Sequence, residues 1–162
     1  MNVPIVQVSL FANENPDQHY RMGQALESLR DEGILIIGAG MAVHNLRDYR
    51  AMRATGETMP YASPYPSKGP LCSAILTPFS YAFSFDEALK EAASSKPKER
   101  ESKMSALMKR SDTRKAHPTL EHIFPMYVAA GAGGLDVGEQ LWTLPEKSLS
   151  WAQYRFGKIA EA

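Results

Sequence analysis

The sequence predicts an α/β fold with a central sheet, a βαβ unit and flanking helices. The run "VPIVQVSL" at 3–10 is apolar and rich in β-branched residues, which is typical of a buried strand. The run "ILIIGAG" at 34–40 is continuously apolar, as in a strand covered on both faces. Residues 17–32 between them carry apolar side chains at helical spacing. Strand, helix and strand in this order indicate a βαβ unit.

Length and composition favour one soluble domain over 1–162, because a chain of 162 residues can bury a real core. The 18 basic residues cancel the 18 acidic ones, and those in 96–115 are interleaved with acidic residues. Such a run is typical of a solvated helix face, so we expect no nucleic-acid partner. A single cysteine, Cys72, fits a reducing compartment. No apolar run reaches transmembrane length, so we expect a cytoplasmic protein without a membrane partner.

Further helices and one more strand are predicted after the βαβ unit. Gly33 is expected to end the helix at 17–32. Ser84 with Glu87 three residues later resembles a capping box and predicts a helix over 84–95. Pro97 predicts the start of another helix over about 98–112. The aromatic-rich tail predicts a final strand around 148–156.

Residues 51–78 differ from the rest of the chain because they are rich in proline and have no clear period. We interpret them as an insertion loop, either a lid or a disordered excursion. Tyr61 and Tyr65 in this loop are candidates to close over an aromatic ligand.

The stretch "KAHPTLEHIFPMYVAAGAGG" at 115–134 carries two histidines. Thr119 is a suitable N-cap, so Leu120 is predicted as the first helical residue and His122 falls in the first turn. The positive end of a helix disfavours imidazolium, which leaves a neutral ring able to bind a metal or act as a base. The alternative is that His122 is only a hydrogen-bonded cap of the helix. Glu121 beside it is a candidate substrate contact, or else a partner of the helix dipole.

His44 and Asn45 follow the second predicted strand and its glycines in "GAGMAVHNL". Glycines allow the backbone to turn tightly beside a ligand, and open α/β sheets bind ligands at the carboxyl ends of their strands. His44 is therefore a candidate site residue. The glycines do not form a dinucleotide-binding fingerprint, because the third glycine is missing.

Four blocks in order resemble one family: "VPIVQVSL", "HYRMGQALESLRDEGILIIGAGMAVHNL", "KAHPTLEHIFPMYVAAGAGG" and "LSWAQYRFG". The family is that of the class III extradiol ring-cleaving dioxygenases of the 4,5-DOPA dioxygenase type. The resemblance covers nearly the whole chain except 51–78, and it matches the C-terminal half of the family. It implies half of an α/β catalytic-subunit fold and insertion of both atoms of O₂ into a catechol-like aromatic substrate.

The same resemblance assigns roles to individual residues. It implies that His44 is an active-site acid or base and that Asn45 orients it. It implies that His122, or else His117, is the ligand that the C-terminal half gives to Fe(II) or Zn(II). The histidine motifs of the family's N-terminal half are not found in this sequence.

Three hypotheses follow, since a facial triad needs three protein ligands. The first is a dioxygenase that is a truncated gene product or acts with a complementing chain. The second is a half-size relative without a metal, which isomerises or cyclises an aromatic metabolite with His44 and His122 as an acid–base pair. The third is a non-catalytic partner subunit or a remnant. Because half a fold leaves sheet edge and apolar surface exposed, we expect a homodimer or a complementing chain.

Overall fold

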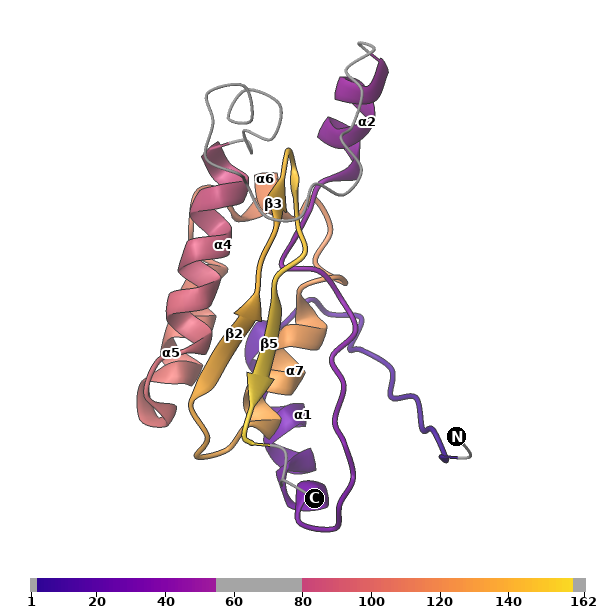
Figure 1. Ribbon diagram of the computed structural model, residues 1–162, viewed down its shortest axis with the longest axis vertical. Helices are drawn as coiled ribbons and strands as arrows, with labels where there is room; N and C mark the ends of the chain where they lie inside the picture. The colour runs from indigo at the N-terminus through magenta and orange to yellow at the C-terminus, as the bar shows by residue number, and fades with distance from the viewer. Residues whose placement is uncertain (1–2, 55–79, 159–162) are drawn as a thin grey trace.

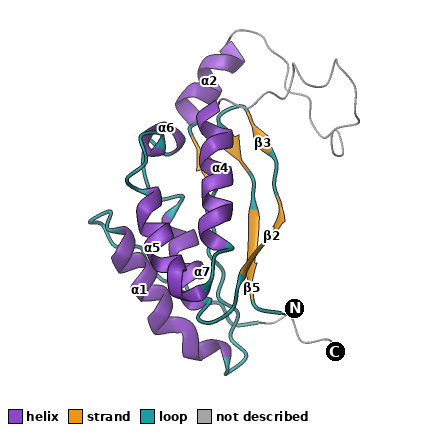
Figure 2. Cartoon of the chain, turned by 90° about the vertical axis from the view of Figure 1, so that its left-hand side faces the viewer, coloured by secondary structure: helices purple, strands orange, loops and turns teal. Residues whose placement is uncertain are grey.

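A computed structural model describes residues 3–54 and 80–158 of the chain. Figure 1 shows long helices packed beside thin, extended strands, and the turned view in Figure 2 places most of the helices on one side of them. The helices are α1 Pro16–Leu26, η1 Glu27–Arg30 (a 3-10 helix), α2 Leu46–Ala54, α4 Ser80–Ala93, α5 Pro97–Leu107, α6 Thr113–Ala116 and α7 Phe124–Ala132. The strands are β1 Val43–His44, β2 Gly138–Trp142, β3 Pro145–Glu146, β4 Leu149–Ser150 and β5 Gln153–Phe156. The predicted α/β class is confirmed.

Helices α1 and α7 pack closely against each other, and glycine makes this possible. A Cβ atom on Gly23 of α1 would collide with the carbonyl of Val128, and one on Gly131 of α7 would collide with the carbonyl of Tyr20. The two backbones therefore approach more closely than side chains would allow. Tyr20 and Tyr127 fill the core beside this contact.

The strands form two small antiparallel sheets. One has the order β1-β4-β3, with Val43 opposite Ser150 and His44 opposite Leu149. The other pairs β2 with β5. The buried carboxylate of Asp86 on α4 accepts hydrogen bonds from the hydroxyls of Ser150 at 2.7 Å and Thr143 at 2.8 Å. These bonds tie the first sheet to the helices.

The two strands of the predicted βαβ unit are not paired. Residues 3–10 and 34–40 run as irregular segments outside both sheets, and every pairing in the described part of the chain is antiparallel. The prediction of buried strands there was wrong for this chain. Ile5 is 91% exposed and Ile37 is 75% exposed. Their sequences suit strands covered on both faces, but the described residues do not supply that cover.

The helical predictions were correct in kind and differ at their ends. Residues 17–32 form α1 and η1, and Gly33 ends them with a φ of 77°. The capping box at Ser84 was wrong, because α4 begins four residues earlier and the Ser84 hydroxyl accepts a hydrogen bond from Arg110. The helix predicted over 98–112 ends at Leu107. The strand predicted around 148–156 is divided into β4 and β5.

The predicted insertion loop at 51–78 falls largely outside the described residues. Its first residues belong to α2, which continues to Ala54. Tyr61, Tyr65 and Cys72 lie among the residues that the structure does not describe. None of the described helices is both long enough and apolar enough to span a membrane.

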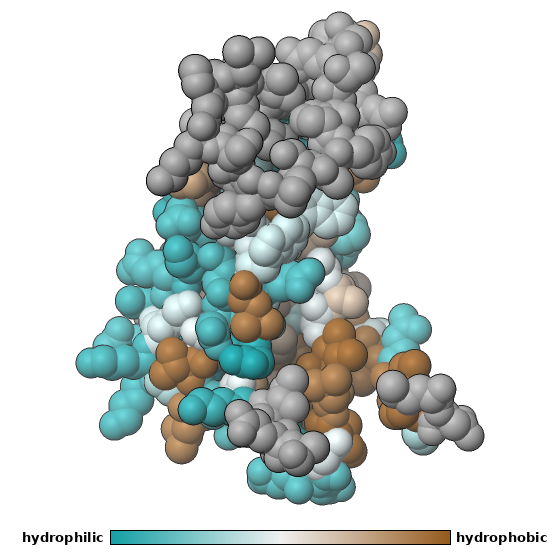
Figure 3. Space-filling view, in the orientation of Figure 1, coloured by the Kyte–Doolittle hydropathy of each residue, from teal (hydrophilic) through white to brown (hydrophobic). Residues whose placement is uncertain are grey.

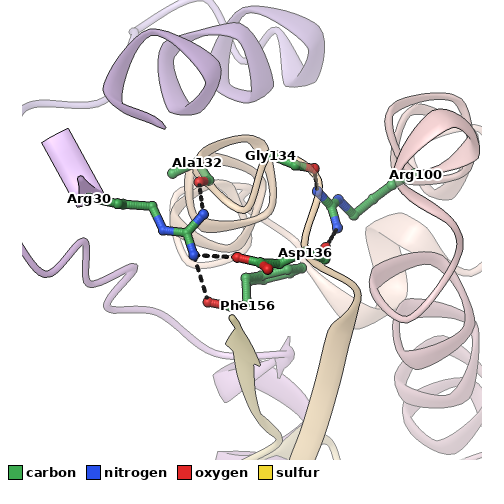
Figure 4. Close-up of polar contacts among 6 residues, drawn as sticks. All are labelled: Arg30, Arg100, Ala132, Gly134, Asp136 and Phe156. Carbon is green, nitrogen blue, oxygen red and sulfur yellow. Dashed lines mark hydrogen bonds and ion pairs between the residues drawn. The ribbon is translucent and has the colours of Figure 1, made fainter. Parts of the chain in front are cut away.

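Two arginines hold the turn that follows α7, as Figure 4 shows. The fully buried guanidinium of Arg100 on α5 donates hydrogen bonds to the carbonyls of Gly134 and Asp136, and also to the Tyr20 hydroxyl at 3.3 Å. The guanidinium of Arg30 forms an ion pair with the Asp136 carboxylate. Carbonyls at the end of a helix need such donors when water is excluded.

Replacing Arg100 should therefore destabilise the fold. We expect Arg100→Met to lower the free energy of unfolding by about 3 kcal/mol, because it leaves buried carbonyls without donors. Urea denaturation followed by circular dichroism measures the change. The matched control is Lys98→Met, an exposed position on the same helix, which should change the free energy by less than about 0.5 kcal/mol. Equal losses in the two variants would contradict a structural role for the buried guanidinium.

Candidate functional site

His44 is positioned by the short strand β1 and by the helix that follows it. Its residue pairs with Leu149 of β4, and α2 begins two residues later at Leu46. The imidazole is half-buried. The first sheet therefore fixes the backbone of His44, while its ring remains accessible from one side.

The segment before β1 brings His44 to His122. A Cβ atom on Gly40 would collide with the carbonyl of His122, and one on Gly38 would collide with the carbonyl of Pro125. The backbone N–H of Met41 donates a hydrogen bond to the His122 carbonyl at 2.9 Å. The glycines were predicted to turn beside a ligand. In the structure they let the chain approach the backbone that precedes and begins α7.

The imidazoles of His44 and His122 are in direct contact, with ring centroids 3.7 Å apart and planes tilted by 40°. The His122 side chain is 39% exposed, and its Nε2 lies 3.7 Å from Oε1 of Glu121. Burial and the neighbouring His122 lower the pKa of His44 below 6.5, which outweighs the opposing effect of Glu121. His44 is therefore mainly neutral at pH 7 and can accept a proton.

The local structure around His122 differs from the prediction. Helix α7 begins at Phe124, so His122 and Glu121 lie in the turn before the helix and Thr119 is not its N-cap. The Thr119 hydroxyl instead donates to the Glu121 carboxylate at 2.7 Å. Burial opposes ionisation of Glu121, but this hydroxyl and the nearby histidines hold the pKa of the carboxyl below its usual value. A carboxylate and two imidazoles thus meet at the surface.

Asn45 is fully buried and connects four parts of the chain. Its side-chain amide donates to the Lys115 carbonyl at 2.8 Å and to the Tyr81 hydroxyl at 3.2 Å, while its side-chain oxygen accepts from the backbone of Asp48. Its backbone exchanges hydrogen bonds with Ser148. Asn45 was expected to orient His44. The side chain bonds to other groups, so any such effect passes through the backbone.

Sequence reasoning missed the partners of Asn45. The Tyr81 hydroxyl donates to the Asp48 carboxylate at 2.8 Å, and burial together with this carboxylate raises the pKa of Tyr81. Asp48 lies three residues after Asn45, which is the spacing of a side-chain cap. That spacing could have identified Asp48, whereas Tyr81 and Ser148 are distant in sequence and carry no local signal.

His117 lies inside the protein. The ring is fully buried, its Nε2–H donates to the carbonyl of Ala42 at 2.8 Å, and its Nδ1 has no hydrogen-bond partner among residues 3–54 and 80–158. Burial lowers the pKa of His117 to about 4. This histidine therefore holds the backbone two residues before His44. Its bonded nitrogen is committed to that carbonyl.

The described residues do not by themselves fit a three-ligand metal site. Within 3–54 and 80–158 no group of three or more His, Cys, Asp and Glu side chains is arranged to hold a metal ion. His44 and His122 are adjacent, but a facial triad needs a third ligand. What this arrangement can do by itself is bind a polar or aromatic group and move a proton.

A groove of about 800 Å³ reaches His122 from the side of β5. Its lining is largely apolar and comes from the segment 33–42, from α7 and from the end of the chain around β5. The groove therefore connects the histidine pair with the unpaired segment that was predicted as a strand.

Comparison with known proteins gives a consistent result. Residues 1–155 match the family model described as the catalytic LigB subunit of aromatic ring-opening dioxygenase. The chain is 34% identical over 134 residues to a 4,5-DOPA dioxygenase extradiol of Beta vulgaris, covering 82% of this chain and 41% of that protein. It is 33% identical over 133 residues to a 4,5-DOPA dioxygenase extradiol-like protein of Schizosaccharomyces pombe, covering 82% and 37%.

A solved structure agrees with the fold. The crystal structure of an uncharacterised protein from Escherichia coli K12 superposes with a TM-score of 0.64 at 24% identity, covering 90% of this chain and 52% of that one. The chain spans less than half the length of the two dioxygenase relatives.

The buried state of His117 predicts a pH dependence of stability. The folded pKa of about 4 lies below the ordinary 6.5, so the unfolded chain binds this proton more readily. The contribution of the neutral, buried His117 to the free energy of unfolding is therefore complete above pH 6.5 and is lost as the pH falls to 4. His117→Gln keeps an N–H donor but cannot take up a proton. Between pH 7 and pH 4, we expect the free energy of unfolding to fall by about 3 kcal/mol more in the wild type than in His117→Gln.

Urea denaturation at a series of pH values measures this difference. A His117→Gln curve parallel to that of the wild type would show that the ring is not held neutral by burial.

Proposed function

Because the chain belongs to the family of the catalytic LigB subunit of aromatic ring-opening dioxygenases, we propose that its paired histidines act on a catechol-like aromatic substrate. The observation that carries this proposal is the contact of His44 with His122, 3.7 Å between ring centroids, at one end of a largely apolar groove. Such a site combines apolar surface for an aromatic ring with polar groups for its hydroxyls.

His44 is the proposed base. Its lowered pKa keeps the imidazole neutral at pH 7, so it can accept a proton from a phenolic hydroxyl and return it later. The Glu121 carboxylate, 3.7 Å from His122, would stabilise the positive charge that develops on the pair. Tyr61 and Tyr65 remain proposed substrate contacts from residues outside the described part of the chain.

The proposed metal, Fe(II) or Zn(II), needs ligands beyond those that the described residues bring together. When bound, such a metal would supply the oxygen chemistry that gives the family its name. We assign to this chain His122 as one ligand, and we propose that groups beyond the described residues contribute the rest.

A second candidate function needs only the groups that the structure brings together. A neutral imidazole in contact with a second imidazole and near a carboxylate can move a proton between two atoms of a substrate. Isomerisation or cyclisation of an aromatic metabolite has this requirement. Dependence of turnover on added Fe(II) separates the two functions.

Binding of an aromatic diol at the histidine pair can be tested without any metal. We expect added DOPA to shift the imidazole NMR signals of His44 and His122 and to leave those of His19 unchanged. His19 is fully buried against Phe124 and serves as an internal control. His44→Gln should weaken DOPA binding about tenfold, the effect of losing one hydrogen bond. Unchanged His44 and His122 signals at saturating DOPA would rule out this site.

Metal titration tests whether the chain alone holds the metal. We expect calorimetry at tens of micromolar protein to show no stoichiometric Zn(II) binding by the chain alone, because two adjacent imidazoles form an incomplete shell. His122→Ala provides the comparison. One-to-one binding that disappears in His122→Ala would mean that the chain supplies the full set of ligands itself.

A further inference from the structure

The groove beside β5 has the features of a position left open for one strand. Its floor is apolar and is formed by side chains of α4 and α7, among them Leu89, Met126 and Ala129. Its two walls are β5 and the segment 33–42. Figure 3 shows apolar surface gathered on this side of the molecule.

Among the described residues, much of the backbone in the two walls of the groove is unpaired, although the Phe156 carbonyl of β5 accepts a hydrogen bond from Arg30 at 3.2 Å. β5 pairs with β2 along one edge, and its sheet has two strands in the described chain. In the opposite wall, Ile34 donates to the Leu29 carbonyl and Met41 to the His122 carbonyl, but residues 35–40 make no backbone hydrogen bond to other described residues. Backbone edges of this kind accept an added strand, which supplies the missing donors and acceptors.

The chain itself carries a segment suited to this position. Residues 3–10 are apolar and uncharged, and Val3, Ile5, Val6 and Val8 are between 55% and 91% exposed. Figure 1 shows the segment leaving the body of the protein. Eight residues in strand conformation span about 26 Å, long enough to pair along 35–40. Pro4 lies near the start of the segment, where a strand tolerates the missing N–H.

We propose that residues 3–10 of a second copy of this chain occupy the groove, and that two copies exchange these segments reciprocally. The segment of the same chain is held away from its own groove. The backbone of Phe11 is anchored by a hydrogen bond to His19, and Figure 1 shows the segment ending on the side of 33–42 that faces away from β5. Each protomer therefore offers one strand and one groove, as a two-fold exchange requires.

The area supports a stable dimer. Each insertion would cover the exposed apolar side chains of 3–10 and those of the facing segment, where Leu35 is 79% exposed and Ile37 is 75% exposed. Two insertions would bury on the order of 2,000 Å², which lies at the upper end of standard protein interfaces. No charged residue lies in either 3–10 or 34–40, so the pairing of these two segments desolvates no charge; the charged residues of the groove, Arg30, Arg155 and Lys158, lie elsewhere in its lining. The inserted strand would pair along 35–40, so the surface next to His122 is left for the proposed aromatic substrate, and this inference does not depend on the proposed chemistry of His44.

Sedimentation velocity at tens of micromolar protein tests the dimer. We expect the wild type to sediment as a dimer, and Val6→Asp and Ile37→Asp each to weaken association by about a hundredfold or more, since a carboxylate would be buried without a partner. Val137→Asp and Leu135→Asp are matched controls, because both positions are exposed and apolar but lie outside the groove. Circular dichroism checks that each variant is folded. A monomeric wild type, or a dimer that survives Val6→Asp, would overturn the proposal.

Cross-linking tests which chain fills the groove. In a Cys72→Ser background, one chain carrying Val6→Cys and another carrying Ile37→Cys are co-expressed with different tags and then oxidised. We expect a covalent product of dimer mass that contains both tags. If instead the double variant on a single chain cross-links at monomer mass and the mixture gives no product, the segment folds back onto its own groove and the exchange is wrong.

Discussion

The hydrogen bond from the Met41 N–H to the His122 carbonyl joins the two halves of the candidate site. It is possible only because Gly38 and Gly40 allow the segment 33–42 to lie against the backbone of 122–125. From this contact the chain continues directly into β1, which places the His44 ring on the His122 ring. A side chain at either glycine would separate these backbones, so the contact of the histidines depends on two residues that have no side chain.

The support behind this contact is polar and buried. His117 holds the Ala42 carbonyl from inside, and Asn45 fixes the next turn to Lys115 and Ser148. Each group acts on the backbone on one side of His44. These bonds fix the backbone of His44 and thereby the position of its imidazole, while one face of the ring remains accessible to a ligand. Residues that resemble ligands in the sequence can therefore serve as supports.

The sequence predicted the parts of the molecule that depend on local chemistry. Helices α1, α4 and α5 appear close to where apolar spacing, proline and Gly33 indicate them. The family resemblance named His44 and His122 as site residues, and in the structure their rings are in contact. The sequence could not predict that His117 is buried, because this depends on its contact with Ala42. Nor could it predict that α7 begins at Phe124, because this depends on packing against α1. The Tyr81–Asn45 contact also joins distant segments and leaves no periodic signal.

For the segments 3–10 and 34–40 the sequence and the structure disagree in a different way. Their sequences are typical of buried strands, but in the structure both segments are largely exposed and unpaired. Such a large exposed apolar surface is unusual on a monomeric protein, because exposing apolar side chains to water is unfavourable. His122 lines the groove, so a strand bound along 35–40 would also reduce the access of water to one side of the histidine pair. With water removed, the charge of Glu121 would act more strongly on the two imidazoles. Assembly and chemistry would then be linked through one residue, because His122 lines the groove and contacts His44.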